Sequence, residues 1–346
     1  MYIKIMNEEN RNIYISNWLL LITILVAIMI VVGGLTRLTD SGLSITKWEL
    51  FSGIIPPFSE DKWENSFSLY KEIPEYKLQN SSMTLQEFKV IYWWEYIHRL
   101  LGRIVGLFFL IPLIYFTYKK IVTKKTLLWF YTIFILILFQ GFVGWYMVKS
   151  GLSDRTDVSH YRLSVHLTLA FIIFILTLWN YLKLKNKNII IYENKIPYFL
   201  PTIFMLFTIV QISIGAFVSG LDAGQIYNSW PSMNGKFFPD DVDLSVFSSL
   251  ALFDIPSIVQ FIHRILAYLI FALFLFILLI TFRNQKLKHL EKNVLIVFFA
   301  LLIQIMLGIF TVLYNAQILI ASLHQFGSII LITSSLILVY KNSKIN

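Results

Sequence analysis

The chain has 346 residues, of which 57% are hydrophobic and only 14% are charged. This composition holds more apolar surface than the core of a soluble domain can bury, so it predicts an integral membrane protein. The formal net charge of +9 does not indicate nucleic acid, because the lysines form short clusters between apolar runs and not a basic patch among exposed aromatic residues. The absence of cysteine excludes disulfides, thiolate metal sites and a cysteine nucleophile.

Apolar stretches of about 20 residues predict eight transmembrane helices. In chain order they begin near Asn17, Ile91, Thr126, Tyr161, Pro197, Ile258, Asn293 and Leu319. The first stretch has a basic flank but lacks the small-residue cleavage site of a signal peptide, so we expect it to be retained. The sequence therefore predicts an all-α polytopic membrane protein.

The distribution of charge orients these helices. The N-terminus, the connections at 119–125, 183–187 and 283–289, and the C-terminal tail hold most of the Lys and Arg residues, whereas the alternate connections are rich in Asp and Glu. By the positive-inside rule both termini are cytoplasmic. The two longest connections, 36–90 and 221–257, then lie outside, where we expect them to form a cap over the helices.

Several motifs occur twice in the same order and divide the chain into two halves. GGLTRLTDSGLSITKW at 33–48 resembles GAFVSGLDAGQIYNSW at 215–230, and YIHRLLGR resembles FIHRILAY. QGFVGWYMV and SVHLTLAF in the first half likewise match QIMLGIFTV and SLHQFGSI in the second. We therefore expect two pseudo-symmetric four-helix bundles, residues 1–190 and 191–346, related by an axis along the membrane normal.

Four of the six histidines lie near the start of the second, fourth, sixth and eighth predicted spans, within about two turns of the outer end. We therefore expect their imidazoles to lie at the same depth in the membrane. They are His98, His166, His263 and His324. A lone intramembrane histidine is usually hydrogen-bonded to a neighbouring helix, but two in each bundle at matching depth indicate ligands. The other two, His160 and His289, fall in polar connections, where we expect solvated side chains.

Two facing histidines in an apolar bundle fit a haem better than a bare metal ion. Zinc would need a third or fourth protein ligand, and each bundle offers only the pair. Haem iron needs only two axial ligands, while its macrocycle fills an apolar slot and its propionates need cations near the wet edge. Arginines on the same side could serve the propionates, or could snorkel to headgroups or pair with a loop acid instead: Arg37, Arg99, Arg103 and Arg264.

Together these residues resemble one known family, the haem A synthases. The resemblance rests on EYIHR and its echo FIHR, on the histidines of SVHLTLAF and SLHQFGS, on GGLTRLTDSGLS and on the eight spans, and it covers essentially the whole chain. Many bacterial members carry a pair of cysteines in the first outer loop, and this chain has none. It is therefore similar to the cysteine-free branch that includes the mitochondrial and alphaproteobacterial enzymes.

The resemblance implies an enzyme that oxidises the C8 methyl group of haem O to a formyl group, giving haem A for cytochrome oxidase. It implies that the C-terminal half binds a haem b cofactor through His263 and His324, with Arg264 beside it. The N-terminal half then holds the substrate, haem O, through His98 and His166, with Arg99 beside it. Without cysteines, any thiol-based electron delivery is excluded, and the electron acceptor stays open.

The expected partners are haem O, haem O synthase, membrane lipid and an unidentified electron acceptor, with a homo-oligomer left open and nucleic acid excluded. The abundance of Ile, Lys and Asn suggests an AT-rich bacterial genome. No Arg-rich, acid-poor transit peptide precedes the first span. We therefore expect the bacterial cytoplasmic membrane and not the mitochondrial one.

One residue distinguishes the two halves. Glu95 precedes His98 by one helical turn and lies on the same helix face, whereas the equivalent position in the second half is Gln260. A buried carboxylate beside the substrate could stabilise positive charge at the reacting carbon or take departing protons, which makes Glu95 the catalytic candidate. The alternative is a structural ion pair between Glu95 and Arg99, one turn further along.

Two other classes of function compete with the enzyme. A di-haem b membrane cytochrome that only transfers electrons would use the same four histidines, but it would not explain the difference between Glu95 and Gln260. A transporter built from parallel repeats would need polar, broken helices at the midplane, whereas the polar groups here cluster at the outer edge.

Overall fold

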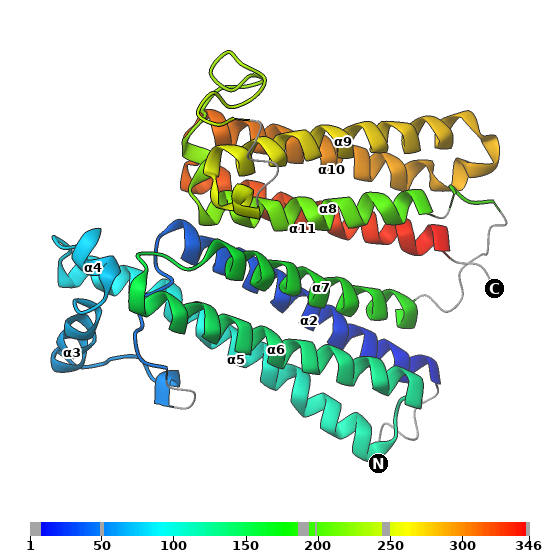
Figure 1. Ribbon diagram of the computed structural model, residues 1–346. Coiled ribbons are helices and arrows are strands. Elements are labelled where there is room, and N and C mark those ends of the chain that lie inside the picture. The colour runs from blue at the N-terminus through cyan, green and yellow to red at the C-terminus, as the bar shows by residue number, and fades with distance from the viewer. Residues whose placement is uncertain (1–7, 49–51, 186–193, 198, 244–249, 344–346) are drawn as a thin grey trace. The chain divides into compact units, whose positions relative to one another are not determined.

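The computed structural model describes residues 8–48, 52–185, 194–197, 199–243 and 250–343. Within these ranges the regular elements are helices, and a single bridge joins Met233 and Lys236. Eight of the described helices are long and apolar enough to cross a membrane. They are α2 (Glu8–Leu38), α5 (Leu85–Lys119), α6 (Lys124–Asp154), α7 (His160–Lys185), α8 (Phe199–Gly220), α9 (Pro256–Arg283), α10 (Lys288–Leu313) and α11 (Ile318–Ser343) (Figure 1). The prediction of an all-α polytopic membrane protein is confirmed.

The chain forms two compact units. Leu20–Phe174 makes up most of the first, and the second contains Asn12–Leu19 of α2 and the chain from Ile175, within α7, onward. The last turns of α7 join the second unit because Tyr340 of α11 donates a hydrogen bond of 2.9 Å to the carbonyl of Leu182. The ring of Trp179 also meets that of Tyr340 edge to face, with centroids 5.3 Å apart. This boundary lies before the one that the repeated motifs predict, and the repeat-based halves stay a prediction.

The helix α5 begins earlier than the apolar pattern predicts. Thr84 and Glu87 form a capping box, in which the hydroxyl of Thr84 accepts from the backbone N–H of Glu87 and the Glu87 carboxylate accepts from the N–H of Thr84 at 2.8 Å. The helix therefore starts at Leu85 and not near Ile91. His98 consequently lies further from the start of its helix than the other three histidines lie from theirs.

The connection between α2 and α5 contains two short helices, α3 (Glu60–Tyr70), which packs on α5, and α4 (Pro74–Leu78), which packs on α6 (Figure 1). Their apolar side chains pack with the start of α5 in an outer cluster, made of Leu43, Trp63, Phe67, Tyr70, Ile73, Phe88, Ile91 and Val158. Aromatic pairs hold it together, such as Phe67 and Phe88 with ring centroids 5.0 Å apart.

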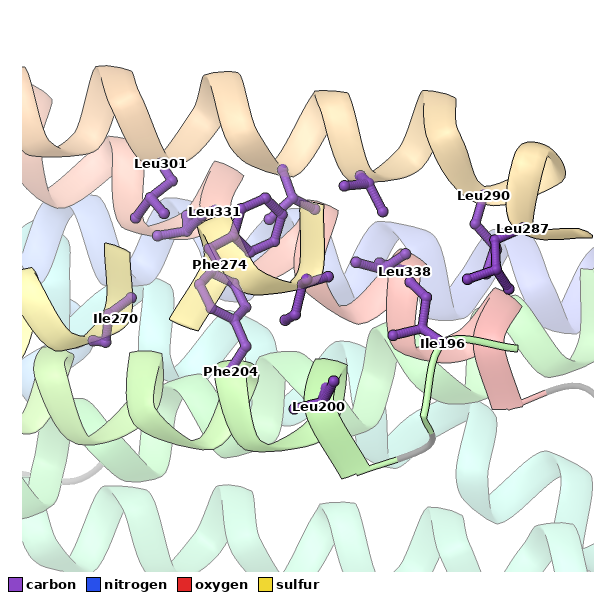
Figure 2. Close-up of a cluster of buried hydrophobic side chains, with 13 residues drawn as sticks. Ile196, Leu200, Phe204, Ile270, Phe274, Leu287, Leu290, Leu301, Leu331 and Leu338 are labelled. Carbon is purple, nitrogen blue, oxygen red and sulfur yellow. The ribbon is translucent and has the colours of Figure 1, made fainter. Parts of the chain in front are cut away.

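In the second unit α8, α9, α10 and α11 form a closed four-helix ring, because each packs on the next and α11 packs on α8. The buried core of this ring is shown in Figure 2. It lies along the parts of α9 and α11 that follow His263 and His324, and it includes Phe204, Phe274 and Leu338. The tightly packed end thus lies away from the two histidines, which occupy the other end of the ring.

Candidate functional site

In the first unit each candidate histidine lies against a glycine of another helix. A Cβ atom placed on Gly33 of α2 would lie 3.0 Å from Nε2 of His98, and one placed on Gly144 of α6 would lie 2.9 Å from Cε1 of His166. A side chain larger than hydrogen would therefore push the imidazole aside. The two glycines form cradles that admit a histidine ring between closely packed helices.

The second unit repeats this arrangement. A Cβ on Gly215 of α8 would lie 3.2 Å from Cε1 of His263, and one on Gly308 of α10 would lie 2.9 Å from Cε1 of His324. Gly33 and Gly215 occupy equivalent places in the repeated motifs, as do Gly144 and Gly308. The same contact therefore occurs on four pairs of helices.

The imidazoles of His98 and His166 have the separation that a haem requires. Their ring centroids lie 6.4 Å apart with an angle of 77° between the planes. Metal–imidazole bonds of about 2 Å on both sides of an iron place two axial rings roughly 6 Å apart, centroid to centroid. Among the described residues no group of three or more His, Asp or Glu could hold a metal ion. The pair therefore fits the two faces of a haem and not a tetrahedral ion.

His263 of α9 and His324 of α11 are the second candidate pair. The Nδ1 atoms of both rings, and that of His166, are buried and make no hydrogen bond within the described part of the chain. A buried ring nitrogen without a hydrogen-bond partner is unfavourable and is unusual for a histidine with a purely structural role. The second pair, which has the same glycine contacts as the first, is therefore the second candidate haem site.

Glu95 is buried, with 2% of its surface exposed, and both carboxylate oxygens are occupied. One accepts hydrogen bonds from the hydroxyl of Ser44 and the backbone N–H of Ile45, each at 2.7 Å. The other accepts from Arg99 at 2.5 Å, and the same guanidinium donates to the carbonyl of Ile45 at 3.0 Å. The ion pair between Glu95 and Arg99 that the sequence offered as an alternative is therefore present, and it holds the 44–45 backbone against α5.

The second unit holds the equivalent backbone without a carboxylate. Arg264 donates to the carbonyls of Tyr227 and Ser229, each at 2.9 Å, and Gln260 also donates to Tyr227 at 3.2 Å. Tyr227 occupies the place of Ile45 in the repeat. Within the described residues Arg264 has no carboxylate partner, and its Nε lacks a hydrogen bond. The two sites therefore share a scaffold and differ in charge.

The other arginines differ in how their charge is compensated. Arg37 pairs with Asp40 at 2.6 Å and approaches Asp157 at 3.7 Å, as the alternative of pairing with a loop acid predicts. Arg103 is half-buried, one turn beyond Arg99 on α5. Arg37 and Arg99 thus have carboxylate partners, whereas Arg264 has none within the described residues.

Sequence reasoning was wrong about His160 and overlooked the glycines. His160 begins α7 and is buried, with its ring centroid 4.4 Å from that of Tyr161, whereas a solvated side chain was expected. Gly144 and Gly308 lie at the same place in the matching segments QGFVGWYMV and QIMLGIFTV, so the repeat itself carried the signal.

The fold and the site define a multi-pass α-helical membrane protein whose paired, glycine-cradled histidines fit haem. Residues 16–336 match the model of a family described as cytochrome oxidase assembly protein, and the chain belongs to that family. It is 50% identical to Heme A synthase of Pelagibacter ubique over 341 residues, which cover 97% of this chain and 99% of that protein. It is 45% identical to Heme A synthase of Rickettsia bellii over 323 residues, 92% of this chain and 95% of the relative. The resemblance to haem A synthases that the motifs predicted is confirmed.

Proposed function

We propose that this chain is a haem A synthase, an oxidoreductase that converts the C8 methyl group of haem O to a formyl group and so supplies haem A for cytochrome oxidase. The observation that carries this proposal is the 50% identity to a protein named Heme A synthase over nearly the whole of both chains. The glycine-cradled histidine pairs support it independently, since they fit haem at two places.

The two pairs have different roles in this proposal. His98 and His166 hold the substrate, haem O, in the N-terminal half, residues 1–190. His263 and His324 hold a resident haem b in the C-terminal half, residues 191–346, with Arg264 close to its propionates. The assignment rests on the resemblance to haem A synthases, and charge supports it, because a buried carboxylate lies one turn from His98 and a neutral glutamine one turn from His263. When bound, haem b supplies one-electron redox chemistry.

The polypeptide would position the substrate and stabilise charge during oxidation. Conversion of a methyl to a formyl group removes electrons and protons from the carbon and adds one oxygen atom, so positive character develops at that carbon. Glu95 is held by Ser44, Ile45 and Arg99 and needs no reorientation when that charge appears. Electrons leave to an acceptor that is not a thiol of this chain, because the chain has no cysteine.

The proposed location is the bacterial cytoplasmic membrane, with both termini in the cytoplasm and the connections 36–90 and 221–257 outside. The basic connections support this orientation by the positive-inside rule. The proposed partners are haem O synthase, which would deliver the substrate, and a redox partner in the membrane. Reporter fusions within 221–257 should report the outer side and fusions at the C-terminus the cytoplasm, and a cytoplasmic signal from 221–257 would contradict the shared depth of the histidines.

The direct test is pigment analysis of the purified protein with and without haem O. Non-covalent haem is extracted and separated by chromatography after expression with haem O synthase. Haem A, or a partly oxidised alcohol form, beside haem b supports the proposal. Protein that carries only haem b and returns haem O unchanged would instead be a di-haem b electron-transfer cytochrome.

A further inference from the structure

A glutamine accompanies three of the four histidine cradles. Gln140 of α6 donates its side-chain amide to the backbone carbonyl of His166 at 3.0 Å. Gln211 of α8 donates to the carbonyl of His263, and Gln304 of α10 to that of His324, each at 2.9 Å. These bonds cross between helices and end on the histidine residue itself.

The glutamines and the glycines belong to one repeated motif. Each glutamine precedes its cradle glycine by four residues, as in QGFVG, QISIG and QIMLG, so the two lie on one helix face. The residue four positions after each histidine is small, namely Gly102, Ala170, Ala267 or Ser328, which leaves the carbonyl open to a neighbouring helix. The amide thus fixes the backbone of the histidine, and the glycine fixes the position of its ring.

The fourth cradle lacks the glutamine. The segment before Gly33 reads MIVVG, so Met29 occupies the place of the amide beside His98. Its methyl group lies 3.7 Å from where a Cβ on Gly102 would be. His98 also turns Nε2 towards its glycine, whereas the other three rings turn Cε1. His98 is therefore the one of the four histidines whose carbonyl receives no amide at this position.

Packing alone does not explain the glutamines. The Oε1 atoms of Gln140, Gln211 and Gln304 are buried and accept no hydrogen bond within the described residues, which is unfavourable in an apolar bundle. Methionine fills the same place at position 29 without that cost. The feature that the glutamines add is the donor to the histidine carbonyl.

We propose that Gln140, Gln211 and Gln304 are positioning residues that hold three axial histidines rigidly, and that Met29 leaves His98 as the exchangeable ligand. The second part rests on the proposed function, because only a substrate haem has to enter and leave. In the resident pair both His263 and His324 accept a glutamine amide at the backbone carbonyl. The substrate pair has one firm ligand, His166, and one that can release the iron when product departs.

The test exchanges the two residue types. Gln211→Met and Gln304→Met reproduce the environment of His98 at the resident pair, and Tyr340→Phe removes an interhelical bond of similar length away from any histidine. We measure the rate at which haem b transfers from the purified full-length protein to excess apomyoglobin, and the spin state of the ferric haem. Partners that orient a metal ligand typically change affinity by about 10–100-fold, so we expect loss of haem b on the order of tenfold faster, with some high-spin signal. Tyr340→Phe should behave as wild type.

Met29→Gln gives the reciprocal result and does not depend on the tolerance of the other variants. The new amide should hold His98, so more substrate or product haem should remain with the protein through purification, and multiple turnover should slow more than the first turnover. Wild-type haem b loss and spin state in both Gln→Met variants would overturn the positioning role. Unchanged retention in Met29→Gln would overturn the exchange role. Protein that keeps haem b but never converts haem O would overturn the proposed function alone, because the haem b comparison does not use conversion.

Discussion

In the N-terminal and C-terminal sites, equivalent arginines bind equivalent segments of backbone. The charge of the arginine is compensated differently in the two sites. Arg99 donates to the carbonyl of Ile45 at 3.0 Å, and Arg264 donates to the equivalent carbonyl of Tyr227 at 2.9 Å. Arg99 has Glu95 as a buried partner, whereas the equivalent residue of the second unit, Gln260, is neutral and donates to the carbonyl of Tyr227. A duplicated scaffold has thus kept its geometry while one residue changes the local charge.

This difference separates two kinds of chemistry. The pair of Glu95 and Arg99 is neutral overall and offers a fixed negative group to positive charge developing nearby. Arg264 keeps its positive charge and so favours the anionic propionates of a haem that stays bound. The difference is consistent with the proposed function, in which the first site carries out turnover and the second retains haem b.

The largest effect is expected when the four histidines are replaced one at a time, which tests whether the two sites have different roles. His263→Ala or His324→Ala should abolish retention of haem b, because the remaining ring supplies only one face. His98→Ala or His166→Ala should leave haem b in place and abolish conversion of haem O. Pyridine haemochrome spectra of the four purified variants measure this, and loss of haem b in His98→Ala as complete as in His263→Ala would show that the halves are wrongly assigned.

Substitution of Glu95, the residue that differs between the two sites, should have the next largest effect. Glu95→Gln nearly preserves the shape, so we expect both haems to remain while formation of haem A falls by about 10²–10³. The structural alternative gives a different outcome: an unpaired, partly buried Arg99 would cost about 3–5 kcal/mol, and the protein would be poorly expressed and depleted of haem. Haem content and haem A yield are measured on one preparation.

The reciprocal variant is the control for Glu95→Gln. Gln260→Glu places a carboxylate beside Arg264, and the added negative charge should lower the midpoint potential of haem b while conversion is retained. A well-folded Glu95→Gln protein with undiminished conversion would contradict both roles of Glu95.

The glycine cradles provide a smaller and more local test. Gly144→Ala puts a methyl group 2.9 Å from Cε1 of His166, whereas Gly141→Ala on the same helix meets nothing within 4 Å. Displacement of the ring should cost about 1–3 kcal/mol and reduce the affinity for the substrate haem by roughly 5- to 150-fold. Titration of both variants with haem O, followed by absorbance, measures this, and equal affinities would show that the cradle does not constrain the histidine.

The smallest expected effect concerns the outer connections, each of which contains a tyrosine bonded to a carboxylate. Tyr70 donates to Glu75 at 3.0 Å in the outer cluster, and burial raises the pKa of Glu75 from 4.5 to about 8. The buried Tyr227 donates to the exposed Asp240 at 2.7 Å in the second unit, and that bond lowers the pKa of Asp240. The first carboxyl is therefore neutral over a range in which the second is charged.

The raised pKa of Glu75 determines the sign of its effect on stability. Between about pH 4.5 and pH 8 the folded chain holds a proton that the unfolded chain has lost, so the first connection should become less stable as the pH rises through this range. Glu75→Gln should remove that dependence and protect α3 and α4 at pH 8 more than at pH 5. Hydrogen exchange of residues 60–78 measures it, and a pH profile unchanged by the substitution would contradict the buried carboxyl.

Local patterns in the sequence were enough for much of this description. Eight apolar runs, the basic connections and the repeated histidine motifs predict the spans and the two pairs, because hydrophobic length and residue type are local properties. The capping box at Thr84 and Glu87 was also visible in the sequence, and it would have placed the start of α5 correctly. The helices α3 and α4 are short and are stabilised by packing in the outer cluster, so the local sequence did not predict them.

The sequence alone predicted a multi-pass membrane protein, its eight spans, the four candidate ligand histidines and the difference between Glu95 and Gln260. The tertiary structure was needed to show that each histidine packs against a glycine and that three of them accept a hydrogen bond from a glutamine of a neighbouring helix. It was also needed to show that both carboxylate oxygens of Glu95 accept hydrogen bonds, whereas Arg264 has no carboxylate partner within the described chain. The physical reason is that a transmembrane helix is apolar on every side, so its sequence carries little information about which face turns inward. The rotation and depth that place the Cβ position of each glycine 2.9–3.2 Å from an imidazole atom arise only when the helices pack together.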